Sequence, residues 1–487
     1  MLARHRPDDA VQRAIDRSGP AAQLVPCRPW CRRCRLRPPV ALEARFARAG
    51  RADTRRVVVI TLGAAAFVLL ILLIIIGVPI GLSLVAVGIG GLAMVGSLST
   101  AMTQTTLALW SEGTKFVLIA IPFYILMGNL IYHTGIAKNL FRAASYWLGW
   151  LPGGLAIAAV FACAGFGAVS GSSTATARTM GAIIIPEMRR YGFGLPLATG
   201  VMSSSGTLGI LIPPSIIMIF YGLMTETSIG QLFVAGVIPG ILIAILFSAI
   251  VVVIVRLDPA QGGHTIDMPP LSERLRALAH ILPVLGLFGF LLGGLYMGVF
   301  TPTEGAVVGV FAVLVMGALQ RRLSLAAIRH ALADAAFLTT MLFMIIVGGT
   351  LFTRFLVQTG FIGALTGWML SMNLGYAPFI IAVTILYLIL GCVLDLFGML
   401  ILTVPILFPI ATSLGIDPVW FGIYIIIVAE IGLVTPPLGV NVYVIKTVAP
   451  DVPLTKIFLG CLPFVAGMLA FITLMAVFPQ IALVMVR

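Results

Sequence analysis

Charged residues are scarce in this sequence. Only 10% of its 487 residues are Asp, Glu, Lys or Arg, whereas 60% are hydrophobic. A water-soluble domain carries about 25% charged residues, so this composition excludes a soluble globule. Apolar runs recur along the chain at about 20 residues, the length at which a helix crosses about 30 Å of hydrocarbon. The composition therefore predicts a multi-pass protein that uses the lipid bilayer as its solvent.

Histidine and cysteine are also rare, with five His and six Cys. Three of the cysteines, Cys27, Cys31 and Cys34, have no His at ligand spacing, and the other three are scattered through apolar segments. Neither a zinc site nor a disulfide framework is indicated. No Walker or GxGxxG pattern occurs between a strand and a helix. An intramembrane enzyme, or ATP hydrolysis by this chain, is therefore disfavoured.

Basic charge is concentrated at the amino terminus. Residues 1–56 hold 14 Arg and five acidic residues, so they supply +9 of the formal net charge of +13. The remaining Lys and Arg residues lie mostly in short loops, which is a pattern of membrane topology and not of nucleic-acid binding. Residues 1–56 lack the apolar core of a signal peptide. We interpret them as a disordered leader, or as the result of a misassigned translation start, and expect them to be absent from the mature protein.

Hydropathy, punctuated by Gly, Pro and charge, predicts ten membrane crossings. They are residues 57–76, 79–97, 115–132, 196–224, 232–256, 278–297, 300–319, 335–353, 418–448 and 457–486. Two further apolar stretches, 152–188 and 376–413, are interrupted midway by small or polar residues. We interpret both as re-entrant hairpins, whose tips are tolerated at mid-membrane only where protein or a wet cavity satisfies their backbone.

The chain also contains an internal repeat. The Pro pair at 436–437 follows the Pro pair at 213–214 by 223 residues, and other Gly and Pro residues match in order at this spacing. Counting Lys and Arg at the membrane edges places the base of the first hairpin in the cytoplasm and the base of the second in the periplasm. Inverted repeats with interrupted helices are typical of secondary transporters. The predicted units are a first repeat over 57–256, a cytoplasmic linker over 257–277 and a second repeat over 278–487.

The tip of the first hairpin is a run of five small or polar residues. Ser170, Gly171, Ser172, Ser173 and Thr174 place hydroxyls and bare backbone at the predicted bilayer centre. Sodium is a small, hard cation that takes such oxygens, and the free N–H groups of the next half-helix suit a carboxylate. A small-residue helix interface is the alternative. We favour an ion and substrate site.

Two spans are expected to unwind before their paired prolines. A Gly-rich stretch followed by Pro frees carbonyl groups that a continuous helix would occupy. Thr207 and Gly209 precede the first pair, and Gly432 and Thr435 precede the second. We expect these backbones to coordinate the ion, with Thr207 and Thr435 as possible side-chain ligands. A structural kink is the alternative for either break alone.

Asp395 is the only acidic residue inside the second hairpin. An intramembrane carboxylate is costly unless it is paired or used. We expect Asp395 to bind sodium, to carry a proton or to orient the substrate, with a salt bridge to Arg178 as the alternative. Glu304 and Glu430 lie near span ends or breaks and are predicted to make structural hydrogen bonds.

The longest motifs resemble the large permease subunit of the tripartite ATP-independent periplasmic (TRAP) transporters, over residues 57–487. They are GAVSGSSTATARTMGAIIIPEMRRYGFG at 167–194, GTLGILIPPS at 206–215, TPTEGA at 301–306 and GIDPVWFGIYIIIVAEIGLVTPPLGVNVYV at 415–444. The resemblance implies an all-α, elevator-type carrier in the bacterial inner membrane. It also implies sodium (Na+) coupling, a small permease subunit and a periplasmic substrate-binding protein as partners.

Carried over by residue, the resemblance implies two sodium sites. The tip at 170–173 with the break at 207–209 forms one, and Asp395 with the break at 432–435 forms the other. A small organic anion would lie between the tips, near Ser172, Ser173, Thr174 and Asp395. The predicted function is sodium-coupled uptake of a carboxylate. A stand-alone divalent anion/sodium symporter is the alternative, whereas hairpins that close on a central site disfavour a channel.

Overall fold

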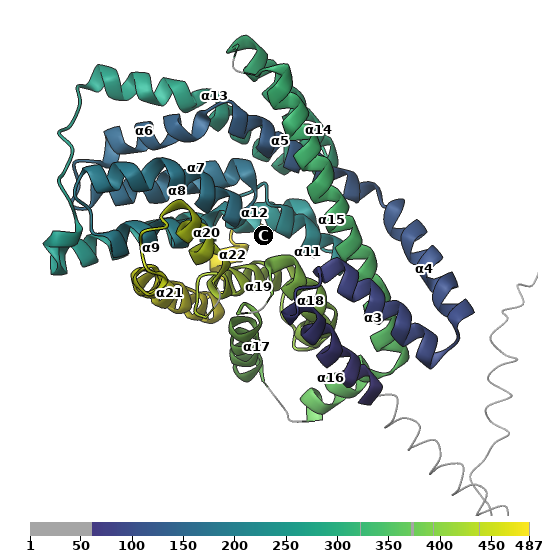
Figure 1. The fold of residues 1–487 in the computed structure, drawn as a ribbon. Coiled ribbons are helices and arrows are strands. Elements are labelled where there is room, and N and C mark those ends of the chain that lie inside the picture. The colour runs from purple at the N-terminus through teal and green to yellow at the C-terminus, as the bar shows by residue number, and fades with distance from the viewer. Residues whose placement is uncertain (1–60, 322, 372–374, 393, 438, 487) are drawn as a thin grey trace, which may run out of the picture. The chain divides into compact units, whose positions relative to one another are not determined.

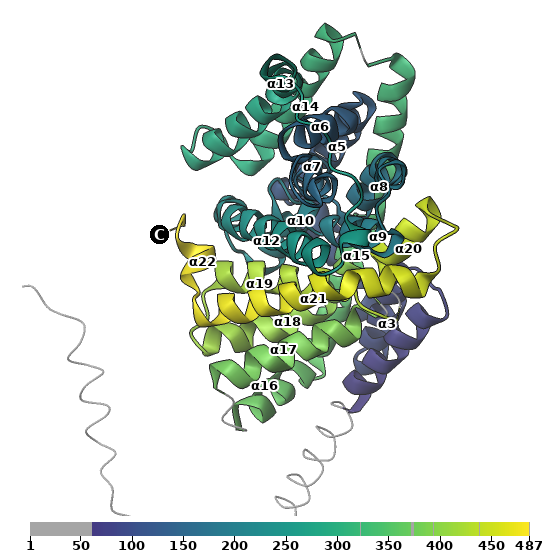
Figure 2. The same ribbon diagram turned by 90° about the vertical axis from the view of Figure 1, so that its left-hand side faces the viewer.

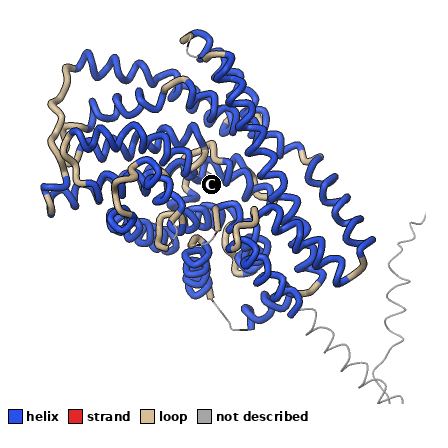
Figure 3. The backbone as a smooth tube through the Cα atoms, in the orientation of Figure 1, coloured by secondary structure: helices blue, strands red, loops and turns tan. Residues whose placement is uncertain are grey.

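The computed structural model describes residues 61–486, with gaps at 322, 372–374, 393 and 438. The chain divides into the units Met1–Arg55 and Arg56–Arg487, and everything below concerns the second unit. The predicted leader lies outside the described residues. Within them the regular elements are all helices, as Figure 3 shows, and the one β-bridge is the isolated pair Phe193 and Gly262.

The first half begins with a helix over Thr61–Ile75. It continues with α3 (Ile80–Val95), α4 (Leu98–Gly113), η1 (Phe116–Ile119), α5 (Ala120–His133), α6 (Ile136–Leu148), α7 (Gly154–Ser170), α8 (Ser173–Arg190), α9 (Leu195–Ser205), α10 (Leu208–Leu211), α11 (Ile216–Thr225), α12 (Ile229–Leu257) and η2 (Pro259–Gln261).

The second half has a similar order of helices, with fewer short helical segments between them. It consists of α13 (Leu271–Tyr296), α14 (Pro302–Leu319), α15 (Leu325–Gln358), α16 (Phe361–Ser371), α17 (Tyr376–Leu390), α18 (Leu396–Ser413), α19 (Pro418–Gly432), α20 (Val440–Val448), α21 (Leu454–Val477) and α22 (Gln480–Leu483).

Six helices in the described residues are long and apolar enough to cross a membrane, and two bent pairs raise this number to eight. Each of the ten predicted crossings coincides with one or more helices of the described residues. The prediction missed α4, which forms a broken span with η1 and α5 at a bend of 63°. It also missed α6 and α16, and it gave only the middle of the 34-residue helix α15.

The internal repeat is visible in the element boundaries. Helix α7 begins at Gly154 and α17 at Tyr376, 222 residues later, while α9 begins at Leu195 and α19 at Pro418, 223 residues later. Helix α15 stands where the first half has α4 and α5. Of the ten crossings predicted from the sequence, five fall in each half. An odd number per half predicts opposite orientations for the two halves, as inverted repeats require.

Helices of one half pack against helices of the other half, and each such contact has a counterpart in which the two halves change places. Helix α9 packs against α21, and its counterpart α19 packs against α12. Helix α11 packs against α18, and its counterpart α20 packs against α8. Figure 2 shows α12, α19 and α21 side by side. Helices α3, α4, α5, α14 and α15 pack on one another as a separate group along one side of the unit (Figure 1).

Helix α14 begins with a capping box. The Thr301 hydroxyl accepts from the Glu304 N–H at 3.3 Å, and the Glu304 carboxylate accepts from the Thr301 N–H at 2.8 Å. The structural hydrogen bond predicted for Glu304 is thus confirmed. Thr301→Ala removes the cap, so we expect it to lower stability by about 1 kcal/mol. Tryptophan fluorescence during unfolding in detergent checks this, with Thr301→Ser as the control that keeps the hydroxyl. Equal midpoints for the two variants would contradict it.

Candidate ion and substrate site

Hydroxyl groups of the first hairpin form hydrogen bonds within its own tip. Helices α7 and α8 pack together and meet at Gly171, whose φ of +60° lies in the left-handed region that favours glycine. The Ser172 hydroxyl caps α8 by accepting from the Ala175 N–H at 3.4 Å. The Ser170 and Thr176 hydroxyls lie 2.7 Å apart. The tip therefore presents several oxygens within one turn of backbone.

This tip sits directly on the first broken helix. A Cβ built on Gly167 would lie 2.1 Å from the Gly209 Cα, so only two glycines allow this contact between α7 and α10. A Cβ on Gly171 would lie 3.1 Å from the Pro214 carbonyl oxygen, and one on Gly209 would lie 3.2 Å from the Ser172 carbonyl oxygen. The structure thus brings together the tip and the break that the sequence predicted to share an ion.

The break itself leaves a backbone carbonyl without its helical donor. The axis bends by 47° between α9–α10 and α11, and the peptide bond between Pro213 and Pro214 is cis. Neither proline has an N–H, so neither can donate to a carbonyl four residues earlier, and the Gly209 carbonyl loses its helical partner. The Thr207 hydroxyl donates to the Ser204 carbonyl at 2.6 Å. The hydrogen of the Thr207 hydroxyl is used in this bond, so its oxygen lone pairs remain available to a cation.

The second repeat builds the same arrangement. A Cβ on Gly391, at the end of α17, would lie 2.5 Å from the Gly432 Cα at the end of α19. The Cys392 thiol lies 3.4 Å from the Pro436 carbonyl oxygen and 3.2 Å from the Leu388 carbonyl oxygen of its own helix. In a continuous helix the Gly432 carbonyl would accept from the N–H of residue 436, but Pro436 has no N–H. It accepts instead from the Thr435 hydroxyl at 3.1 Å. The second hairpin thus rests on the second break through a glycine pair, as the first does.

Asp395 is the cap of helix α18. Its carboxylate accepts from the Gly398 N–H at 3.0 Å, and its side chain is half-buried. The alternative salt bridge is not observed, because neither Asp395 nor Arg178 makes an ion pair within the described part of the chain. A Cβ on Gly398 would lie 3.0 Å from Ile80 of α3. Asp395 therefore lies where the tip of the second hairpin meets helix α3, which belongs to the group formed with α4, α5, α14 and α15.

Each tip also contacts the other repeat. Phe220 of α11 packs edge-on against Phe397 of α18, with ring centroids 5.4 Å apart. The Ser173 hydroxyl lies near the carboxyl group of Glu430, and both side chains are buried. The Thr174 hydroxyl lies 3.3 Å from that of Ser172. Of the predicted substrate ligands, Ser173 therefore faces the interior of the protein, while Ser172 and Thr174 share the tip surface.

Glu430 differs from the expectation that it makes structural hydrogen bonds. It is fully buried at the end of α19, and neither of its carboxyl oxygens has a hydrogen-bond partner of good geometry. The Ser173 side chain lies near its carboxyl group. The proximity of Ser173 and Glu430 brings the first hairpin next to the second repeat. The 223-residue spacing of the repeat gives no indication of this proximity.

Two site residues were missed from the sequence. Thr176 bonds to the Ser172 carbonyl at 2.7 Å as well as to Ser170. Its position four residues after Ser172 on a helix is a signal that it faces the tip. Gly128 of α5 would place a Cβ 3.0 Å from the Val169 carbonyl oxygen, so α5 contacts the first tip through a glycine. A glycine inside an apolar helix was the only sign of this contact.

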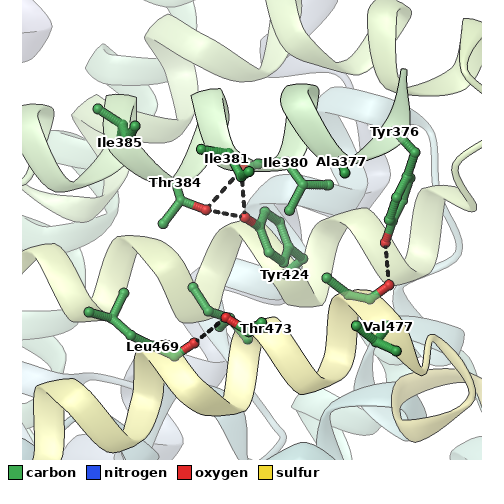
Figure 4. Close-up of a pocket in the computed structure, with 12 residues that line it drawn as sticks. Tyr376, Ala377, Ile380, Ile381, Thr384, Ile385, Tyr424, Leu469, Thr473 and Val477 are labelled. Carbon is green, nitrogen blue, oxygen red and sulfur yellow. Dashed lines mark hydrogen bonds between the residues drawn. The ribbon is translucent and has the colours of Figure 1, made fainter. Parts of the chain in front are cut away.

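A cavity of about 620 Å³ between α17, α19 and α21 is apolar (Figure 4). Its hydroxyl groups are already bonded: Tyr424 donates to the Ile380 carbonyl at 3.0 Å, and Tyr376 donates to the Ala476 carbonyl at 2.9 Å. No charged side chain lines it. The cavity therefore offers nothing that recognises a small anion, and the hairpin tips remain the candidate site.

Comparison with known proteins identifies the family of this chain. Residues 67–481 match the model of a family described as the tripartite ATP-independent periplasmic transporter, DctM component. The chain belongs to this family. It is thus a multi-pass inner-membrane transporter permease of the TRAP class and not an enzyme.

Relatives within the TRAP family carry several substrate names. The chain is 36% identical to the C4-dicarboxylate large permease DctM of Pseudomonas aeruginosa, covering 77% of this chain and 87% of that protein. It is 31% identical to the sialic acid large permease SiaM of Vibrio cholerae, covering 84% and 95%. It is 32% identical to the ectoine/5-hydroxyectoine large permease UehC of Ruegeria pomeroyi, covering 87% and 98%.

The fold is similar to a solved transporter as well. The crystal structure of YdaH from Alcanivorax borkumensis matches with a TM-score of 0.58, covering 79% of this chain and 89% of that one. Only 15% of the aligned residues are identical, so this likeness concerns the fold alone.

Proposed function

We propose that this chain is the membrane-embedded carrier of a sodium-coupled uptake system for a small organic carboxylate. It would work with a small permease subunit and a periplasmic binding protein, as its family membership implies. The observation that carries the proposal is the paired seating of two hairpin tips on two helices broken at paired prolines. Such breaks place backbone oxygen and free N–H groups deep in the bilayer, where an ion and an anion need them.

Sodium coupling is supported by the kind of atoms at the two breaks. The Gly209 and Gly432 carbonyls have lost their helical donors to proline. The Thr176 hydroxyl lies near Gly209, and the Thr435 hydroxyl donates to the Gly432 carbonyl. A sodium ion needs several oxygen ligands in place of its water. The Asp395 carboxylate would add a formal negative charge at the second tip. A freed carbonyl beside a hydroxyl is what a cation site requires, and this pair recurs once in each repeat.

An elevator movement is supported by the grouping of the helices. The hairpins and broken helices form one packed group, and α3, α4, α5, α14 and α15 form another. The first tip meets α5 at Gly128, and a Cβ on Gly349 of α15 would overlap Ile401 of α18. Glycine at such contacts lets the two groups approach closely. The boundary between them is where one group would move past the other.

A carboxylate substrate is supported by the names of relatives and by the site. Three relatives named for C4-dicarboxylates are 34% to 36% identical to this chain. Relatives at 30% to 32% are named for sialic acid, isethionate and ectoine, so the substrate differs within the family. The N-terminus of α8 at the first tip suits a carboxylate because its N–H groups carry partial positive charge.

Uptake by proteoliposomes tests the proposal. The chain would be reconstituted with a small permease subunit and candidate binding proteins, and given a panel of radiolabelled dicarboxylates, sugar acids and keto acids. We expect accumulation of one class with an inward sodium gradient and none with an equal potassium gradient. Accumulation that ignores sodium would overturn the coupling. Full uptake without the two partners would favour a stand-alone symporter.

A further inference from the structure

A second cavity, of about 240 Å³, lies between the two helix groups. Helices α4 and α15 form one wall, and α11 and α18 form the other, so both repeats contribute. In contrast to the apolar cavity of Figure 4, charged and hydroxyl side chains line this one. The side chains that matter for recognition are Lys115, Glu112, Glu226, Thr350, Thr353 and Arg354.

Arg354 is the cation of this cavity that has no carboxylate partner. One nitrogen of its guanidinium group donates to the Gln104 backbone carbonyl at 3.3 Å and to the Gln104 side-chain oxygen at 2.8 Å. No Asp or Glu oxygen of the described residues lies within ion-pair distance of it. Lys115, by contrast, is paired with Glu112 at 2.8 Å. A guanidinium group has five N–H donors in a fork that fits a carboxylate, and Arg354 retains donors for one.

The position of Arg354 along α15 places the cavity at one membrane face. Arg354 lies 29 residues after Leu325, the first residue of α15, which is about 44 Å along the helix axis. That is longer than the roughly 30 Å of hydrocarbon. The positive-inside rule puts the start of α15 in the cytoplasm, because Arg321 and Arg329 flank it. Arg354 therefore lies toward the periplasm.

The cavity also leads toward the second tip. Ile401 of α18 lines it and lies six residues after Asp395, which is about 9 Å along the helix. Phe220 lines the cavity as well and packs against Phe397, two residues after Asp395. The Phe220–Phe397 pair thus connects the cavity wall to the start of α18.

We infer that this cavity is an entry vestibule for the anionic substrate, in which Arg354 receives a carboxylate group from the periplasmic side. The inference rests on the proposed uptake of a carboxylate. Thr350 precedes Arg354 by about one turn and Thr353 is its immediate neighbour in the chain, and both line the cavity with hydroxyl groups. Glu112 and Glu226 keep the cavity near neutral overall, so an anion is held briefly and released, as passage along a path of sites requires.

The rates at which anionic and cationic thiol reagents modify a cysteine beside Arg354 test whether Arg354 attracts anions. This test does not require the substrate to be known. Thr353→Cys would be placed in a version of the chain without its six natural cysteines, in membrane vesicles that hold the full complex. The probes are an anionic sulfonatoethyl and a cationic trimethylammonium-ethyl methanethiosulfonate. Arg354→Gln is expected to lower the anionic-to-cationic rate ratio about tenfold, because one nearby charge is removed. Arg354→Lys should keep most of the ratio.

Arg329→Gln is the matched control, since it removes an exposed charge from the opposite end of the same helix. It should leave the ratio unchanged. A ratio that is the same with Arg354 and with Gln would overturn the vestibule. So would a Thr353→Cys side chain that neither reagent reaches, because the cavity would then be closed to water.

Succinate uptake by the same vesicles separates this inference from the proposed function. Arg354→Gln should raise the succinate KM about tenfold while the sodium concentration for half-maximal uptake stays constant. Wild-type uptake that needs no sodium would overturn the proposed coupling and leave the vestibule intact. An unchanged succinate KM would overturn the vestibule and leave the coupling intact. If wild-type vesicles do not accumulate succinate, the labelling ratio decides.

Discussion

A single methyl group on Gly167 is expected to abolish transport. Its Cβ would lie 2.1 Å from the Gly209 Cα and 2.8 Å from the Gly209 nitrogen, and both are backbone atoms. A side chain can relieve such overlap by changing rotamer, but backbone cannot, so α7 must move away from α10. We expect Gly167→Ala to cost about 3 kcal/mol, the upper end of overpacking penalties, and to separate the first tip from its break.

Gly165→Ala is the matched control for this variant. It lies on the same helix, and its Cβ would make only ordinary contact, 3.4 Å from a Leu140 methyl carbon. Gly391→Ala should reproduce the Gly167 effect in the second repeat, because its Cβ would lie 2.5 Å from the Gly432 Cα. Thermal unfolding in detergent and uptake in proteoliposomes check all three. If Gly167→Ala behaved like Gly165→Ala, the hairpin would not be seated as described.

The hairpins and breaks were predictable because their causes are local. Proline lacks an N–H wherever it occurs, so the pairs at 213–214 and 436–437 reveal freed carbonyls without any tertiary information. Recurrence at a fixed spacing showed that the same device is used twice. The structure then adds the glycine pairs that seat each tip, and a glycine inside a predicted helix was their only trace.

The relations between repeats were not predictable in this way. The contact of Ser173 with Glu430 joins residues 257 positions apart, and no periodic pattern connects them. The cavity at Arg354 needs α4 and α11 from one half and α15 and α18 from the other. Helix α4 itself was missed because its sequence is too polar for a free-standing span. Its packing against α3 and α15 explains why it is nevertheless helical.

Asp395→Asn tests whether the charge at the second tip is used for the ion. Asparagine keeps an oxygen that accepts from the Gly398 N–H, so the cap of α18 and the fold should survive. The negative charge is lost. We expect sodium affinity to fall about 30- to 150-fold, which corresponds to about 2–3 kcal/mol for an interaction with a charged ligand. The sodium dependence of uptake in proteoliposomes measures this.

Asp417→Asn provides the comparison that isolates charge from capping. Asp417 caps α19 by accepting from the Val419 and Trp420 N–H groups at 2.9 and 3.1 Å, as Asp395 caps α18. Both substitutions exchange a capping carboxylate for a capping amide, but only one lies at a hairpin tip. Lower sodium affinity in Asp395→Asn alone would assign the effect to the ion site. Equal affinity in the two variants would mean that Asp395 serves the helix and not the ion.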